Sequence, residues 1–266
     1  MCRGAMSHTV LLSGPPGCGK TTWILSQIQS HRGPSGYLRV TGYPDEGLAQ
    51  ARDGGLDLAY LRDQCPDLLD LGDLDQALAP HPADLLALIE LPQFHPPAQQ
   101  GLAGMDRRVM PQLEALHLNP DRHLHFGRDP ELPRHDTLDF SHLQAWSLNL
   151  NDTVWDPDSL SSFWFELVNG AYGDVYRAKA LMNLPDGRAF FCNWMVSQEG
   201  SQFLPLQTIA PPDGRPERLS HLVVQGRDLD PAAIEATVRD CLLSDAVLEL
   251  YQAPLRQHHT APTRSA

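Results

Sequence analysis

The sequence predicts an α/β fold in which a parallel sheet of few strands is followed by a small α+β domain. An apolar run from His8 to Ser13 leads into a glycine-rich stretch and then into a helical pattern. Strand and helix patterns alternate up to about residue 140, which is typical of a parallel sheet, and several strands with two helices follow. We therefore expect one domain over residues 1–140, a second over 141–253 and a disordered tail over 254–266.

The glycine-rich stretch GPPGCGKTT fits the phosphate-loop pattern G-x-x-x-x-G-K-[ST]. Its glycines let backbone N–H groups turn inward and form an anion-binding concavity. Lys20 would reach the outer phosphates of a nucleotide, and the Thr21 hydroxyl would ligate Mg²⁺. The sequence thus predicts a P-loop NTPase domain that binds GTP or ATP with Mg²⁺. The expected nucleotide-binding residues are Gly14, Pro15, Pro16, Gly17, Cys18, Gly19, Lys20, Thr21 and Thr22.

The rest of the first domain alternates between strand and helix patterns. A helix is expected over Thr21–Ser30, and Leu85–Ile89 has the composition of a fully buried parallel strand. In such a sheet a ligand binds at the carboxyl ends of the strands. Further expected elements are strands at Tyr37–Thr41 and His123–Phe126, helical patches at Leu56–Arg62 and Leu68–Leu78, and a helix at Arg107–Leu118.

Glu90 directly follows the buried strand and is the candidate catalytic residue. A phosphate-loop hydrolase needs an acidic residue at the end of a neighbouring strand to steer Mg²⁺ and its waters. We therefore expect Glu90 to act in catalysis and to hold the metal together with Thr21. The alternative is a carboxylate at the solvated end of a strand.

The second half predicts a small antiparallel sheet with helices on one face. The stretch LPDGR indicates a hairpin turn, and Asp156-Pro157 and Asp230-Pro231 are typical helix starts. Expected elements are strands at Trp146–Asn151, Val175–Asn183, Ala189–Val196 and His221–Gln225, a helix to about Asn169 and a last helix to about Ser244.

The composition limits which kinds of partner the protein is expected to bind and in which cellular compartment it is expected to lie. The net charge of −13 argues against a general affinity for nucleic acid or for anionic membrane surfaces. The five cysteines are scattered without a C-x-x-C pair, and no stretch reaches the ~20 apolar residues of a membrane span. With no signal peptide recognisable, we expect a cytoplasmic protein with free thiols.

Three stretches resemble the CobW-like nucleotide-dependent metallochaperones, a family named after cobalamin-synthesis protein W. They are GPPGCGKTT, LIELPQF, and YRAKALMNLPDGRAFFCNW followed by SHLVVQGRDLDPAAIEATVRDCLL. The resemblance implies a GTPase domain followed by a CobW-type C-terminal domain. It also implies GTP hydrolysis coupled to the delivery of a transition metal, such as Zn²⁺, to a client metalloprotein. Glu90 would stand where the glutamate of the family's E-x-x-G motif stands.

The chain departs from the family pattern at three places. Gln93 replaces the glycine of E-x-x-G, and no N-K-x-D loop exists, although Asp129 could replace its aspartate. The C-x-C-C metal motif is absent, with Cys65 alone in the matching region. One thiolate cannot form a tetrahedral site, which takes about four ligands. The remaining candidate ligands, whose presence is better explained by surface composition, are His81, His95, His123 and His125.

Three functions stay open on this basis. The first is a GTPase whose nucleotide state controls docking of a client through the C-terminal domain. The second is a degenerate module that senses nucleotide with little hydrolysis, which Gln93 favours. A small-molecule kinase is less well supported, because no arginine-bearing lid is recognisable. The sequence leaves the oligomeric state and the choice between GTP and ATP undetermined.

Overall fold

A computed structural model describes residues 8–15, 17–40, 55–73, 82, 84–92, 109–133, 143–198 and 200–260. Contacts between Cα atoms divide the chain into two compact units. The first comprises Met1–Asp45 and Gln64–Ser141, and the second comprises Glu46–Asp63 and His142–Ala266. The sequence-based domain bounds stay predictions, but the contacts place one helix of the N-terminal half with the second unit.

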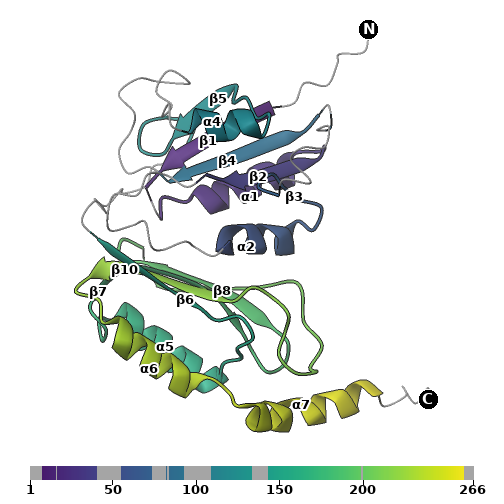
Figure 1. The fold of residues 1–266 in the computed structure, drawn as a ribbon, viewed down its shortest axis with the longest axis vertical. Helices are drawn as coiled ribbons and strands as arrows, with labels where there is room; N and C mark the ends of the chain where they lie inside the picture. The colour runs from purple at the N-terminus through teal and green to yellow at the C-terminus, as the bar shows by residue number, and fades with distance from the viewer. Residues whose placement is uncertain are drawn as a thin grey trace. The chain divides into compact units, whose positions relative to one another are not determined.

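The first unit contains a parallel sheet with the strand order β3-β2-β4-β1-β5 (Figure 1). Strand β1 is hydrogen-bonded on both sides, and its Leu12 lies opposite Glu90 of β4. The carboxyl ends of β1 and β4 therefore meet at one edge of the sheet. The strands are β1 His8–Gly14, β2 Ser35–Arg39, β3 Leu69–Asp70, β4 Leu86–Pro92 and β5 Arg122–His125.

Two helices of the first unit pack on this sheet. Helix α1 (Lys20–Ser30) contacts β1 and β4 and buries Ile24 and Ile28. Helix α4 (Met110–Ala115) adds Leu113 to a cluster that includes Leu11 of β1 and Ile89 of β4. Because strand residues alternate between faces, Leu12 and Glu90 point to the face opposite this cluster.

The predicted helix over Leu68–Leu78 is wrong where the structure describes it. Residues Leu69–Asp70 form strand β3, which pairs with Gly36 and Tyr37 of β2. A Cβ on Gly36 would lie 2.7 Å from the Leu71 side chain, so the glycine makes room for Leu71 against the sheet. Pairing with β2 and burial of Leu71 thus override the local helical spacing.

The second unit contains an antiparallel sheet with the order β6-β10-β7-β8-β9. The hairpin expected at LPDGR joins β7 to β8. Strand β9 was not predicted from the sequence, because its four residues carry little periodic signal. The strands are β6 Gln144–Asn149, β7 Asp174–Asn183, β8 Ala189–Met195, β9 Gln202–Pro205 and β10 His221–Arg227.

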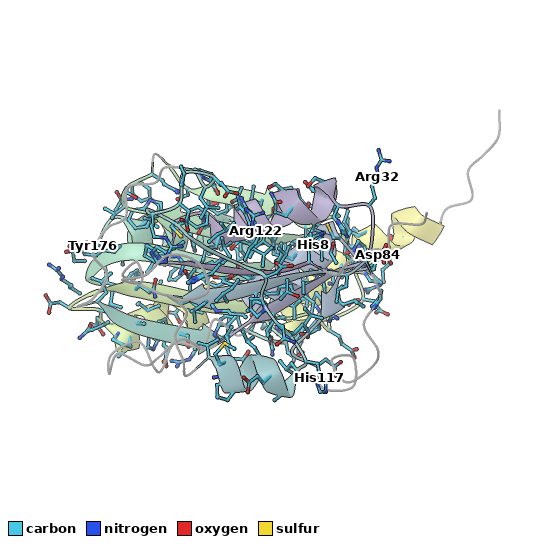
Figure 2. The ribbon with its side chains drawn as sticks, turned by 90° about the horizontal axis from the view of Figure 1, so that it is seen from above. His8, Arg32, Asp84, His117, Arg122 and Tyr176 are labelled. Atoms are coloured by element: carbon cyan, nitrogen blue, oxygen red, sulfur yellow. The ribbon has the colours of Figure 1, made fainter. Side chains whose placement is uncertain are left out.

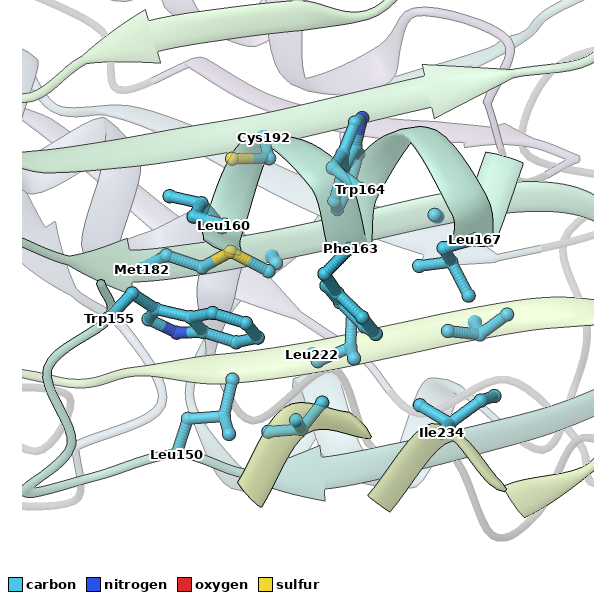
Figure 3. Packing of buried hydrophobic residues seen from close by; sticks show 14 of the residues in the cluster. Leu150, Trp155, Leu160, Phe163, Trp164, Leu167, Met182, Cys192, Leu222 and Ile234 are labelled. Carbon is cyan, nitrogen blue, oxygen red and sulfur yellow. The ribbon is translucent and has the colours of Figure 1, made fainter. Parts of the chain in front are cut away.

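Helices α5 (Pro157–Val168) and α6 (Pro231–Cys241) lie side by side on one face of this sheet (Figure 1). Asp156 and Asp230 cap them as predicted, each accepting a hydrogen bond from a backbone N–H three residues on. Aromatic and aliphatic side chains fill the layer between helices and sheet (Figure 3). They include Trp155, Phe163 and Ile234.

The predicted disordered tail is wrong for residues 254–260, because helix α7 (Asp245–Thr260) continues through Pro254. Contacts to the preceding loops hold this helix. The Gln252 side chain is buried and bonds to Gly214 and Pro185, while Arg256 donates to the Pro212 carbonyl. The rest of the predicted tail lies outside the described residues.

Helix α2 (Leu56–Gln64), which the sequence predicts nearly to its bounds, is grouped with the second unit through Asp63. Its Asp57 forms an ion pair with Lys179 of β7, and its Tyr60 ring stacks on Phe191 of β8. Within the residues that the structure describes, no helix combines the length and apolarity needed to cross a membrane.

Candidate active site

The phosphate-loop motif joins β1 to α1 in the expected strand–loop–helix order. Gly17 and Gly19 have φ values of 80° and 95°, in the left-handed region that glycine adopts at little cost. Gly19 is also the N-cap of α1 and supplies no side-chain hydrogen bond to the helix. The N-terminus of α1, which favours negative charge, is thus not capped by a side chain. Pro16 lies outside the described residues.

Gly14 is fixed by close packing. A Cβ at this position would lie 2.9 Å from both the Cys18 Sγ and the Phe126 Cβ. Phe126 follows β5, so the neighbouring strand presses on the first residue of the loop. Any side chain at Gly14 would force one of these groups to move.

Lys20 is buried and folds back over the loop that precedes it. Its Nζ donates to the carbonyl oxygens of Gly14 at 2.9 Å and Pro15 at 2.8 Å. The Nζ also lies 3.7 Å from Oε1 of Glu90. The ammonium group therefore sits between the loop and the end of β4, where it can meet the phosphates of a nucleotide.

Glu90 is only 3% exposed, which rules out a solvated carboxylate at the end of a strand. Its Oε2 accepts a hydrogen bond of 2.7 Å from the Tyr37 hydroxyl, while Oε1 faces Lys20. The carboxylate is therefore held between a phenol and an ammonium group. The structure thus brings Lys20 and Glu90 together, as the prediction of one candidate site requires.

Sequence reasoning missed Tyr37. Tyr37 lies on β2, which pairs with β4. The residue after Tyr37 is the partner of Ile89, so Tyr37 is diagonal to Glu90 across the two strands. The signal in the sequence was a tyrosine within a segment that has the pattern of a buried strand. That strand, β2, pairs in parallel with β4, which carries Glu90. Recognising it requires the register of β2 against β4, which periodicity alone does not give.

Thr21 and Thr22 occupy the first turn of α1, with Thr21 partly buried and Thr22 exposed. Hydroxyl and carboxylate oxygens are the ligands that Mg²⁺ takes alongside phosphates and water. The donor set of Thr21 and Glu90 therefore fits this metal chemically, next to the cation Lys20. The buried, partnered Glu90 and the uncapped N-terminus of α1 are the features that support this fit.

His123 and His125 are buried, so their interpretation as surface residues is wrong. His123 Nε2 and His125 Nδ1 both lie 2.7 Å from the Ser13 Oγ. The Ser13 hydroxyl also lies 3.3 Å from the Leu124 carbonyl oxygen, so its one proton can go to that carbonyl or to one imidazole, while its lone pairs accept from a ring N–H. Burial, together with nearby cations led by Arg128, lowers the pKa of His125 to about 4, and the ring is neutral at pH 7.

Asp129 is already engaged in local contacts after β5. Its carboxylate accepts the backbone N–H of His125 at 2.7 Å and hydrogen bonds from the Arg128 guanidinium. Burial raises the pKa of Asp129, but these hydrogen bonds outweigh burial and lower the pKa overall. The carboxylate closes the turn in this structure.

Transition-metal ligands are not gathered among the described residues, where no group of three or more His, Cys, Asp or Glu side chains could hold an ion. Cys65 is partly buried, and burial raises the pKa of its thiol. Three further residues named above, His81, Gln93 and His95, lie outside the described residues.

Comparison with known proteins gives one match to a family model, in the C-terminal half, and matches to two solved structures. Residues 144–242 match the family model of the cobalamin synthesis protein cobW C-terminal domain. Comparison with curated proteins gives no match. A Zn(II)-bound YjiA GTPase from E. coli is 13% identical, with a TM-score of 0.31, over 89% of this chain and 98% of that one. A Zn(II)-bound triple mutant of YjiA GTPase covers the same shares at 15% identity and a TM-score of 0.31. Such distant likenesses place no site residue in this chain.

Proposed function

We propose that the chain is a cytoplasmic, nucleotide-binding CobW-like protein, because residues 144–242 match the family model of the cobW C-terminal domain, in agreement with the resemblance found in the sequence. It binds GTP, or alternatively ATP, with Mg²⁺ at the phosphate loop and hydrolyses it. Its C-terminal domain docks a client metalloprotein, to which the protein delivers a transition metal such as Zn²⁺.

One observation carries the nucleotide part of this proposal. The Lys20 ammonium group and the Glu90 carboxylate, 70 residues apart in sequence, are buried together at the carboxyl ends of β1 and β4. A buried charged pair is costly to maintain and contributes little net stability, so its presence beside a phosphate loop favours a functional role. The buried pair beside the loop therefore supports the interpretation of this segment as a nucleotide-binding loop over its interpretation as a glycine-rich turn without a ligand.

Each residue has a task in this proposal. Lys20 Nζ would exchange the carbonyls of Gly14 and Pro15 for phosphate oxygens, and the N-terminus of α1 would attract the same charge. Thr21 and Glu90 would hold Mg²⁺, which supplies neutralisation of the phosphate charge when it is bound. Tyr37 would keep the Glu90 carboxylate in a fixed orientation.

Calorimetric titration of GTP and ATP with Mg²⁺ tests this assignment. Lys20→Ala should weaken binding by about 10- to 100-fold, because a hydrogen bond to a charged group contributes about 1.5–3 kcal/mol. The matched control is Arg32→Ala, which removes a positive charge from an exposed side chain that projects into open space (Figure 2). Equal affinities for wild type and Lys20→Ala would refute nucleotide binding at this loop.

The second candidate is a module that binds nucleotide but hydrolyses it negligibly. Glu90 favours it, since its carboxylate is already engaged by Tyr37 and lies near Lys20. Phosphate release from GTP and ATP separates the two candidates, with Glu90→Gln as the test and Glu114→Gln, on the exposed side of α4, as the control. Turnover that Glu90→Gln abolishes and Glu114→Gln leaves intact supports hydrolysis by the site.

The metal-delivery part calls for its own measurement. Metal analysis of the purified protein, after growth with zinc and cobalt, should find stoichiometric transition metal if the chain carries a cargo. Nucleotide without transition metal would support the module that only senses nucleotide.

A further inference from the structure

Helix α2 is anchored on the antiparallel sheet of the second unit by two pairs of side chains. Asp57 forms a buried ion pair with Lys179 of β7. The Tyr60 ring stacks on Phe191 of β8, with centroids 4.4 Å apart and planes 17° from parallel. Residues three positions apart share one face of a helix, so both contacts hold the same face of α2.

Asp63 adds a third anchor near the end of the helix. Its carboxylate accepts the backbone N–H groups of Gln207 at 2.6 Å and Thr208 at 2.9 Å. The apolar side chains of Leu56 and Leu61 on the same helix are fully buried. Helix α2 is therefore a fixed part of the second unit, although it lies in the N-terminal half of the sequence.

The chain that follows α2 continues to the candidate active site. A turn, closed by a hydrogen bond of 3.0 Å from the Leu68 N–H to the Cys65 carbonyl, leads into β3. The buried Leu71 comes directly after β3 and donates its backbone N–H to the Tyr37 carbonyl at 3.0 Å. The Tyr37 hydroxyl in turn donates to the carboxylate of Glu90.

We call residues Leu56–Asp70, which comprise α2, the turn 65–68 and β3, the α2–β3 link. The link is held at both ends, by the antiparallel sheet at α2 and by pairing with Gly36 and Tyr37 at β3. Energetic coupling between distant sites is carried by packed side chains, hydrogen bonds and rigid elements. The link supplies these in an unbroken series from Phe191 to Tyr37.

We propose that the α2–β3 link couples the antiparallel sheet to the Mg²⁺-holding part of the nucleotide site. The link reaches Tyr37 and through it Glu90, whereas the carbonyl partners of Lys20 belong to the phosphate loop. A change on the sheet therefore alters the Mg²⁺-dependent part of nucleotide binding. Because coupling is reciprocal, bound Mg²⁺-nucleotide alters the sheet by the same factor. This coupling deepens the client docking of the proposed function and rests on the proposed nucleotide binding.

Calorimetric titration of GTP and ATP, with Mg²⁺ and with EDTA in its place, tests the coupling. Phe191→Leu removes the ring that stacks on Tyr60 and should weaken binding at least about fivefold with Mg²⁺ but less than about twofold without it. The matched control is Phe203→Leu on β9, whose ring packs edge-on against Trp164 of α5. Equal affinities of the two variants with Mg²⁺, or an equal loss with and without Mg²⁺, would overturn the proposal. If Phe191→Leu does not fold, Asp63→Ala, at a partly exposed side chain, replaces it.

An insertion separates transmission through the link from a general loss of stability. Gly-Gly-Ser inserted after the exposed Pro66 lengthens the turn between α2 and β3. In that background Phe191→Leu should change Mg²⁺-dependent binding by less than about twofold, because the two ends of the link then move independently. With the same insertion after Gly200, where an added side chain would meet nothing within 4 Å, the fivefold effect should persist. An effect of Phe191→Leu that survives the insertion after Pro66 would contradict the coupling.

Amide exchange tests the link without nucleotide. The Leu71 N–H should exchange at least about tenfold faster in Phe191→Leu than in Phe203→Leu, because its hydrogen bond opens more often when α2 is loosened, while the Leu12 amide of β1 keeps its rate. Unchanged exchange at Leu71 would refute the link itself. Equal nucleotide affinities for wild type and Lys20→Ala would instead refute the proposed function and leave the exchange result standing. The two failures are therefore distinguishable.

Discussion

Removing the Tyr37 hydroxyl tests whether the buried carboxylate of Glu90 is held as the structure shows. Tyr37→Phe keeps the buried ring and deletes a 2.7 Å hydrogen bond to Glu90 Oε2. A hydrogen bond to a charged group contributes about 1.5–3 kcal/mol. In a protein of this size about 1 kcal/mol corresponds to 2–4 °C, so Tm should fall by about 3–12 °C.

Scanning calorimetry measures this shift, with Tyr176→Phe as the matched control. The Tyr176 ring lies at the edge of its unit beside Arg227, so loss of its hydroxyl should shift Tm by less than about 1 °C (Figure 2). The double variant Tyr37→Phe/Glu90→Gln should lose less than the sum of the two single changes, because both remove the same contact. A shift in Tyr37→Phe no larger than in the control would refute the reasoning.

Three further predictions concern the loop, the imidazoles and the C-terminal core. Gly14→Ala should weaken nucleotide binding at least about tenfold in calorimetry, because its Cβ would meet Phe126 at 2.9 Å. His125 has a pKa of about 4 when folded against 6.5 unfolded, so the unfolded chain binds more protons between these values and stability falls as pH falls. Urea unfolding should show about 2 kcal/mol lost from this group between pH 7 and pH 5, and His125→Gln should lose that part of the slope; an unchanged slope contradicts it. Phe163→Ala should cost about 3–5 kcal/mol in urea unfolding, since the buried ring packs against Trp155, whereas the exposed Phe165→Ala should cost under about 1 kcal/mol.

Local sequence signals were sufficient for the elements that carry the site. The glycine-rich stretch predicted β1, the loop and α1, because turn chemistry and apolar spacing act over a few residues. Glu90 could be predicted because a buried apolar run ends at it, and the structure places it 3.7 Å from Lys20. The caps Asp156 and Asp230 are local signals of the same kind.

Features that depend on distant pairing could not be predicted. Tyr37 meets Glu90 only through the register of β2 on β4, and Ser13 meets His123 and His125 only because β1 lies beside β5. In each case the partners are more than 50 residues apart in sequence. Their periodic patterns record which residues are buried but not which strand lies next to which.

The prediction of a disordered tail was wrong at helix α7 for a related reason. Pro254 and the polar residues after it suggest the end of ordered structure, whereas Gln252 and Arg256 reach loops about 40 residues earlier in the chain. Proline lacks one backbone donor and costs about 3 kcal/mol or more inside a helix. Several side-chain contacts to those loops compensate for it here.

The position of β1 between β4 and β5 has a consequence for how the first unit opens. Backbone ladders to β4 on one side and β5 on the other must both break before this strand can separate. Amide exchange proceeds through such openings, and their free energies approach that of global unfolding in doubly paired strands. The amides of Val10 to Leu12 should therefore be among the slowest to exchange in this unit. The glycine-rich loop thus follows directly on a strand that opens only when most of the unit unfolds.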